Sequence, residues 1–239
     1  MSAHGRRHRE ALEKVDRDRE HAPAEAVALV KSLANTKFDE SVELHVRTGL
    51  NVRHADEQLR GTIALPNGLG KDVKVVVFAQ GDKAREAEQA GADVVGAEDL
   101  AKRIEEGFDD FDVAIATPDL MSVVGRLGRI LGPSGKMPNP KVGTVTMDVS
   151  KAVEDSKSGK VEYRTDRTAI VHMVIGKVSF DEQRLLENYA AVVEELIRAR
   201  PSAAKGRYLR TITLTSTMGP GIKVDPSRTR DIVEEAAAA

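Results

Sequence analysis

Hydrophobic and polar residues follow two different patterns along the chain, and each pattern predicts a different kind of sheet. In residues 41–47 the apolar side chains of Val42, Leu44 and Val46 alternate with polar ones, as in a strand with one buried face. Three short runs rich in apolar residues are instead typical of parallel strands covered on both faces; they are residues 73–79, 92–95 and 113–117. We therefore expect one half-exposed sheet and one fully covered sheet.

Predicted helices lie before, between and after these strands. Apolar residues recur at helical spacing in residues 24–34, which follow Pro23, and in residues 181–200, which precede Pro201. Further helices are expected among the apolar runs, at residues 83–90, 98–106 and 119–131. Strands that alternate with helices in this way indicate a compact α/β domain with a parallel sheet.

Alternating strands return later, at residues 161–165, 169–175 and 209–217, and the first two are expected to form a hairpin around Asp166. The first 67 residues supply too few elements for a core of their own. The predicted fold class is therefore α/β plus α+β: a discontinuous α+β domain of residues 1–67 and 159–239, into which a three-layer α/β domain of residues 68–158 is inserted. The turn-forming residues 61–70 predict a hinge.

Composition limits the class of protein. The chain has 239 residues, 41% hydrophobic and 31% charged, and no apolar run approaches the roughly 20 residues that span a bilayer, so a disordered chain and a membrane protein are excluded. It has no cysteine and its N-terminus resembles no secretory signal, so we expect a cytoplasmic protein without disulfides. Aromatic residues make up only 3%, which argues against a single-stranded nucleic-acid binder built on stacking.

Charge is distributed unevenly between the predicted domains. Residues 68–158 carry 12 basic and 16 acidic side chains, whereas residues 159–230 carry 13 basic and 8 acidic ones. Residues 1–67 balance at 11 of each sign. The asymmetry indicates two units with different surfaces, although ordinary solvated charge produces the same pattern.

A segment rich in glycine and proline, residues 132–144, is the most unusual stretch of the sequence. Its spacing differs from that of a phosphate-binding loop, because Gly132 and Gly135 stand too close together before Lys136 and no Ser or Thr follows the lysine. A rigid loop that caps the sheet edge or packs on the other domain is therefore favoured over a ligand site.

Three polar clusters are candidate binding sites, and each also has an ordinary structural explanation. The strand 210–217 presents a row of threonines, which is either a solvated strand face or a set of hydrogen-bonding groups for ribose and phosphate. Residues 164–168, with His172, form a polar turn whose two arginines either bind phosphate, oriented by an adjacent Asp, or make a local ion pair. Lys37 and Phe38, taken alone, are a solvated charge beside a core residue.

Residues suited to catalysis or metal binding are few. The six histidines are scattered, no carboxylate–histidine spacing resembles a zinc site and no nucleophile elbow occurs, so we expect no enzyme, no metal and no cofactor. The alternative is a nucleotide-binding α/β enzyme built on the inserted domain, but the turn after residues 73–79 contains only Gly81 where a dinucleotide fingerprint needs several glycines. A protein scaffold indifferent to RNA is a third hypothesis.

Seven segments, taken together and in order, carry a resemblance to a known family. They are LANTKFDESVELHV, LPNGLGK, ATPDLM, LGRILGPSGKMPNPKVGTVT, VEYRTDRTAIVH, GKVSF and TSTMGPGIKVDP. From about residue 5 to residue 226 the chain closely resembles the bacterial large-subunit ribosomal proteins of the mobile stalk, the first family in the large-subunit naming series. The resemblance implies a discontinuous α+β RNA-binding domain, an inserted Rossmann-like domain and a hinge between them.

The resemblance also implies which residues bind RNA and what the protein does. The RNA-binding residues carried over are Lys37, Phe38, Arg164, Thr165, Asp166, Arg167, Thr168, His172, Thr215, Thr217, Met218 and Gly219. The implied partners are large-subunit ribosomal RNA, the mRNA of the protein's own operon, which it represses, and transiently the exit-site tRNA, whose release the stalk assists. Off the ribosome we expect a monomer, with no membrane partner.

Four positions depart from the family's usual pattern. Thr165 stands where Asn is common and Arg167 where Lys is common, and the charge kept at residue 167 predicts an intact main site. Ala169 stands where Gly is usual, which predicts a conventional φ at that turn. Ser134 replaces a frequent Arg, and together with the acidic insert this change weakens the case for strong RNA binding by the inserted domain.

Overall fold

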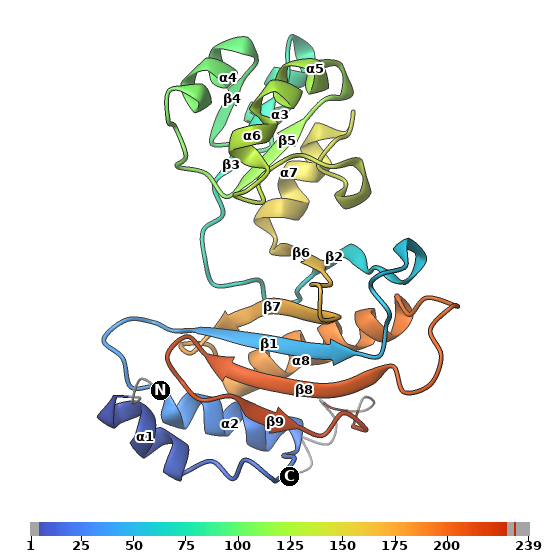
Figure 1. The fold of residues 1–239 in the computed structure, drawn as a ribbon. Helices are drawn as coiled ribbons and strands as arrows, with labels where there is room; N and C mark the ends of the chain where they lie inside the picture. The colour runs from blue at the N-terminus through green and yellow to red at the C-terminus, as the bar shows by residue number, and fades with distance from the viewer. Residues whose placement is uncertain (1–4, 229–231, 233–239) are drawn as a thin grey trace. The chain divides into compact units, whose positions relative to one another are not determined.

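The alternating segments form a four-stranded antiparallel sheet in the computed structural model, which describes residues 5–228 and residue 232 (Figure 1). The strands lie in the order β7-β1-β8-β9, with bounds β1 (Ser41–Thr48), β7 (Ile170–Lys177), β8 (Leu209–Ser216) and β9 (Ile222–Val224). β1 pairs antiparallel with β7 on one edge and with β8 on the other. The sheet therefore joins an early segment of the chain to segments that follow much later.

One face of this sheet is buried beneath helices. The apolar residues of β1, which are Val42, Leu44 and Val46, are at most 1% exposed, as their alternation predicts. Helices α2 (Pro23–Leu33) and α8 (Glu182–Arg198) pack against the sheet and against each other, while the short helix α1 (Arg6–Glu13) precedes α2 (Figure 1). The polar residues of the same strands consequently face away from the core.

A second, parallel sheet has apolar clusters on both faces. Its order is β4-β3-β5, with β3 (Val75–Phe78), β4 (Val94–Gly96) and β5 (Val113–Ala116). Phe78 packs with residues of α4 (Glu98–Glu105), whereas Val77 packs with residues of α3 (Asp82–Gln89) and α7 (Val149–Lys157) on the opposite side. Coverage on both faces explains why these strands are apolar throughout.

The chain divides into two compact units. The first comprises residues 1–70 and 163–239, and the second comprises residues 71–162. The predicted boundaries, after residues 67 and 158, lie a few residues earlier in the chain. The ends of the predicted first domain, at residues 1–4, 229–231 and 233–239, lie outside the described residues.

Residues 119–131 do not form the single helix that was expected. Instead they are split into η2 (Pro118–Leu120), α5 (Met121–Val124), η3 (Gly125–Leu127) and α6 (Gly128–Leu131). Gly125 and Gly128 each lower the helix propensity at the points where the helix changes type. In contrast, α7 was missed, because only Val149, Ala152 and Val153 mark its apolar side.

The expected hairpin around Asp166 is also wrong. The strand before the turn, β6 (Lys160–Arg164), pairs with β2 (Arg60–Ala64) in a separate two-stranded sheet, while the strand after it, β7, pairs with β1. A bridge between Thr165 and Val171 joins the two sides of the turn. The chain therefore passes from one sheet into another at Asp166, and part of the predicted hinge at residues 61–70 is strand β2.

The buried side chain of Asn188 holds the turn after β2 in place. Asn188 lies on α8 and is fully buried. Its Oδ1 accepts a hydrogen bond from the backbone N–H of Asn67 at 3.0 Å, and its Nδ2 donates to the carbonyl oxygens of Gly68 at 3.0 Å and Ile175 at 2.7 Å. One amide thus satisfies backbone groups of both a partly buried loop and a buried strand, and buried backbone groups need such partners.

We expect Asn188→Ala to lower the free energy of unfolding by about 3 kcal/mol, because three hydrogen bonds are lost and the buried carbonyl of Ile175 is left without a partner. Urea denaturation measures this change. Gln183→Ala, an exposed substitution on the same helix, is the control and should change stability by less than about 0.5 kcal/mol. A loss at residue 188 as small as the control's would show that Asn188 does not hold the turn.

Candidate nucleic-acid interface

Three rows of side chains make up the open face of the four-stranded sheet, which is the face opposite α2 and α8. The middle row crosses all four strands, and its members are His172, His45, Thr213 and Lys223. The flanking rows are Val174, Glu43 and Thr215 on one side and Ile170, Arg47 and Thr211 on the other. The strand register therefore gathers positive, hydroxyl and imidazole groups on one surface.

Two histidines contact each other at the centre of the open face. Nδ1 of His45 lies 2.9 Å from Nδ1 of His172, and the rings meet edge to face. The outer Nε2 atoms lie near carboxylates, His45 at 3.7 Å from Glu43 and His172 at 3.5 Å from Asp166. Burial and the neighbouring His172 lower the pKa of His45, against the opposing effect of Glu43.

Asp166 organises the turn before β7. Its carboxylate accepts hydrogen bonds from the backbone N–H groups of Thr168 at 2.8 Å and Ile170 at 2.7 Å, and from the hydroxyl of Thr168. Burial alone would raise the pKa of Asp166, but these hydrogen bonds and His172 outweigh it and lower the pKa to about 2. The carboxylate is therefore engaged in holding the turn.

The prediction of a conventional φ at Ala169 is wrong. Its φ is +61°, in the left-handed region that non-glycine residues seldom occupy. Asp166 bonds the amides of Thr168 and Ile170, on both sides of Ala169, and the Asp166 carbonyl accepts the Ala169 N–H at 3.2 Å. These contacts hold the alanine where a glycine would sit without strain.

Arg164 and Arg167 leave the turn as exposed cations. Neither guanidinium group makes a hydrogen bond or ion pair within the part of the chain that the structure describes. The expectation that Asp166 orients the two guanidinium groups is therefore wrong. Thr165 differs from both, because it is 7% exposed and exchanges hydrogen bonds with the backbone of Leu59. Its hydroxyl places the strand and is not offered to a partner.

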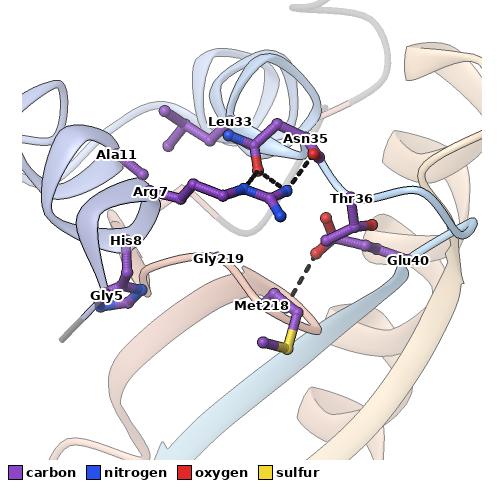
Figure 2. Close-up of a pocket in the computed structure, with 10 residues that line it drawn as sticks. All are labelled: Gly5, Arg7, His8, Ala11, Leu33, Asn35, Thr36, Glu40, Met218 and Gly219. Atoms are coloured by element: carbon purple, nitrogen blue, oxygen red, sulfur yellow. Dashed lines mark hydrogen bonds between the residues drawn. The ribbon is translucent and has the colours of Figure 1, made fainter.

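A second carboxylate, Glu40, supports the turn after β8. It is only 2% exposed, and its Oε2 accepts the backbone N–H of Met218 at 3.0 Å (Figure 2). Burial acts to raise the pKa of Glu40, but the hydrogen bond from Met218 and the nearby polar groups of Ser216 and Thr36 leave this pKa below its ordinary value. Residues 217–219, which we call the Met218 turn, are thus fixed from inside the protein.

Hydroxyl groups complete the Met218 turn. The Thr217 hydroxyl accepts the N–H of Ser41 at 3.0 Å, and the Thr215 hydroxyl donates to the carbonyl of Gly219 at 3.2 Å. A Cβ at Gly219 would lie 2.5 Å from the Ser216 Oγ, so any larger residue there would require the Ser216 side chain to move. In the predicted threonine row, the hydroxyls of Thr215 and Thr217 are therefore engaged in hydrogen bonds within the protein.

Exposed apolar side chains flank the Met218 turn. Met218 is 63% exposed and Phe38 is 55% exposed, and Lys37 beside Phe38 is exposed as well. The interpretation of Phe38 as a core residue is wrong. Large apolar side chains in such positions are a mark of interaction sites when polar groups surround them.

A pocket of about 250 Å³ lies next to the Met218 turn (Figure 2). Its walls come from α1, the end of α2 and the turn itself, and they include Arg7, Leu33 and Met218. The Arg7 guanidinium donates to the Asn35 side chain at 2.6 Å and to its carbonyl oxygen, which ties α1 to the segment before β1. This part of the surface is consequently built by both ends of the first unit.

Two members of the middle row, His45 and Lys223, were not among the predicted candidates, whereas His172 and the threonine row that contains Thr213 were. The alternation of residues 41–47 showed that His45 faces away from the core, but its neighbours were unknown. Thr213 and Lys223 face the same way on β8 and β9 and reach the row only through the strand register. Register between distant strands is not readable from local patterns, so only the exposure of these residues was predictable.

Neither a metal centre nor a membrane span is found among the described residues. Residues 5–228 and 232 contain no group of three or more His, Asp or Glu side chains placed to hold a metal ion. No helix in the same part of the chain has the length and apolar content needed to cross a bilayer.

Comparison with known proteins gives matches over nearly the whole sequence. The ribosomal protein L1p/L10e family matches residues 30–220. The large ribosomal subunit protein uL1 of Thermobifida fusca is 58% identical over 96% of this chain and 97% of its own, and that of Rubrobacter xylanophilus is 60% identical over 95% and 99%. The uL1 protein of Rhodococcus erythropolis is 57% identical over 96% of each chain.

The acid stability of the first unit provides a test of the Asp166 turn. We expect the free energy of unfolding to fall more steeply between about pH 4 and pH 2 in the wild type than in Asp166→Asn. A carboxyl pKa of about 2 in the folded state means that its stabilisation is complete above the unfolded pKa of about 4 and is lost as pH falls toward 2.

Denaturation with urea at each pH measures the effect. Asp56→Asn, at an exposed position of the same unit, is the control and should keep the wild-type profile. Parallel profiles for the wild type and Asp166→Asn would rule out this role for the carboxylate.

Proposed function

Because the chain belongs to the ribosomal protein L1p/L10e family, we propose that its first unit binds large-subunit rRNA through the open face and the two turns beside it. Family membership makes the chain a protein of the large ribosomal subunit, where it binds rRNA. One observation supports the location of this site within the chain, which is that the first unit holds exposed cations, hydroxyl groups and apolar side chains around a rigid sheet.

Three cations supply the charge for this proposed site. Arg164, Arg167 and Lys37 are exposed and make no hydrogen bond or ion pair within residues 5–228 and 232. Free guanidinium groups bind phosphate through two parallel hydrogen bonds without first breaking a contact in the protein. The counterions released from the RNA then contribute to affinity.

Hydrogen bonding and packing supply shape recognition. The Thr213 hydroxyl can donate to a phosphate oxygen, and the backbone carbonyls of Thr217 and Met218 can accept from ribose hydroxyls. Met218 and Phe38 provide apolar surface that excludes water around those polar contacts. Asp166 and Glu40 act indirectly, because each fixes a turn whose neighbouring residues meet the RNA. We therefore assign Asp166 and Thr165 a positioning role within the predicted site.

We propose in addition that the bound protein forms part of the mobile stalk beside the tRNA exit site and assists the release of deacylated tRNA. The two units suit this role, since the first carries the RNA-binding groups and the second, residues 71–162, has 13 basic and 17 acidic side chains. This excess of negative charge disfavours RNA binding and would leave the second unit free of the tight rRNA contact. In this proposal the protein is cytoplasmic, on the ribosome, and monomeric when it is free.

The same surface explains the proposed repression of the protein's own operon. An mRNA site that imitates the rRNA site would occupy the open face and the Met218 turn, so the two RNAs would exclude each other. The names of the three relatives favour this family of functions over the alternative of a nucleotide-binding enzyme.

We expect Arg164→Ala and Arg167→Ala each to weaken rRNA binding by about tenfold, because a charge-assisted hydrogen bond to phosphate contributes about 1.5 kcal/mol or more. Each should also reduce the slope of log affinity against log salt concentration by the amount that corresponds to about one phosphate contact. Filter binding at several salt concentrations measures both quantities. A fragment of the cognate rRNA, identified by footprinting the full-length protein, serves as the ligand.

Arg126→Ala is the matched control for these two variants. Arg126 is also exposed and without a partner in the described residues, but it belongs to the second unit. It should leave both affinity and salt slope unchanged. Equal losses at Arg126 and Arg167 would mean that rRNA binding is not confined to the first unit.

Competition between the two RNAs tests the proposed repression. We expect the leader of the protein's own mRNA to displace the rRNA fragment completely. Arg164→Ala and Arg167→Ala should each lower the affinity for both RNAs by a similar factor. Fluorescence anisotropy with labelled rRNA measures the displacement, and an mRNA of scrambled sequence is the control. Simultaneous binding of both RNAs to one protein would contradict a shared site.

A further inference from the structure

The middle row sets four hydrogen-bonding side chains across the whole width of the sheet. Strand pairing places His172 beside His45, His45 beside Thr213 and Thr213 beside Lys223. Side chains opposite each other on one face of a sheet have Cβ atoms about 5 Å apart. The row is therefore a continuous polar track that ends in an ammonium group at the β9 edge.

The contact between the two imidazoles limits how many protons they hold. With the Nδ1 atoms 2.9 Å apart, one must carry a hydrogen while the other offers its lone pair. In the neutral pair the donating ring, His45 or His172, has an unprotonated Nε2, which is an acceptor. One added proton turns that Nε2 into a donor and keeps the contact, whereas a second would set two N–H groups against each other.

Charged groups approach the pair from β1, from the turn before β7 and from β9. From β1, the Glu43 carboxylate lies 3.7 Å from His45, and Arg47 lies two residues further along the strand. From the turn before β7, Asp166 lies 3.5 Å from His172. The neighbours on β8 are threonines, and Lys223 on β9 is the next cation along the row.

These groups act in opposite directions on the proton balance of the pair. Burial and the second ring favour neutral His45, as its lowered pKa reflects, while the two carboxylates favour a protonated pair. A further negative charge placed against the row would add to the effect of the carboxylates. An RNA phosphate on the open face supplies such a charge.

We propose that the middle row is a binding site for an RNA phosphate and that the His45–His172 pair takes up one proton when the phosphate binds. The inference rests on the proposed function, since it needs RNA on the open face. The proton comes from the solvent and stays on an imidazole Nε2, and no covalent bond between heavy atoms changes. Thr213 and Lys223 supply the remaining donors of the row.

The direction of the pH dependence follows from linkage. If phosphate binding favours the protonated histidine pair, then protonation of the pair strengthens RNA binding by the same free energy. The affinity for RNA therefore falls as pH rises through the titration of the bound pair. One proton limits the effect to tenfold per pH unit. Unperturbed histidine titrates between about pH 5 and 8, a range in which exposed Lys223 and the carboxylates keep their charges.

Proton uptake is measured directly by calorimetry of the full-length protein with the rRNA fragment, near neutral pH, in two buffers of different ionisation enthalpy. We expect uptake approaching one proton, and affinity at constant ionic strength should fall by more than about tenfold, and by no more than about a hundredfold, between pH 6 and pH 8. The double variant His45→Gln/His172→Gln keeps two hydrogen-bonding side chains that cannot be protonated, so its affinity should not vary with pH. His54→Gln, at an exposed histidine outside the sheet, should behave as the wild type.

Two results would overturn the inference and leave the proposed function intact. One is RNA binding by the wild-type protein without proton uptake, a measurement that does not depend on the folding of any variant. The other is a pH dependence that persists in the double variant His45→Gln/His172→Gln. Failure of the wild-type protein to bind the rRNA fragment at every pH would instead overturn the proposed function, and this inference with it.

Discussion

β1 is held along both edges by strands from the far part of the chain, and the placement of every group on the open face depends on that pairing. His45 and His172 touch although 127 residues separate them. A shift of one residue in the register would turn Leu44 outward and His45 into the core, because successive side chains of a strand point to opposite faces. The burial of Val42, Leu44 and Val46 therefore fixes the surface as firmly as it fixes the core.

The two turns beside the sheet are held by the same physical device. Asp166 and Glu40 each collect backbone N–H groups, and in each case those bonds overcome the effect of burial and lower the pKa of the carboxyl. An acidic residue on a surface proposed to bind an anion would otherwise repel it. The backbone N–H dipoles that point at Asp166 and Glu40 offset the negative charges of these carboxylates. The two turns are therefore held rigidly with little repulsion of an anion.

Periodicity along the chain predicted the elements that rely on local patterns. The alternation in β1, the apolar face of α8 and the apolar run of β3 all appear in the structure as expected. Features that depend on partners elsewhere were not predictable. Residue 169 lies in the left-handed region because the Asp166 carboxylate accepts hydrogen bonds from the amides on both sides of it. Thr165 is buried because it pairs with Leu59, which lies more than 100 residues earlier in the chain.

The long separation between β1 and its partners also orders events during synthesis. β1 leaves the ribosome well before β7 and β8, whereas the strands and helices of residues 71–162 follow one another closely and can fold as they emerge. Until β8 arrives, the central strand lacks one edge and the Met218 turn does not exist. A nascent or truncated chain is thus unable to present the assembled surface, and RNA would be engaged only by protein whose translation is nearly complete.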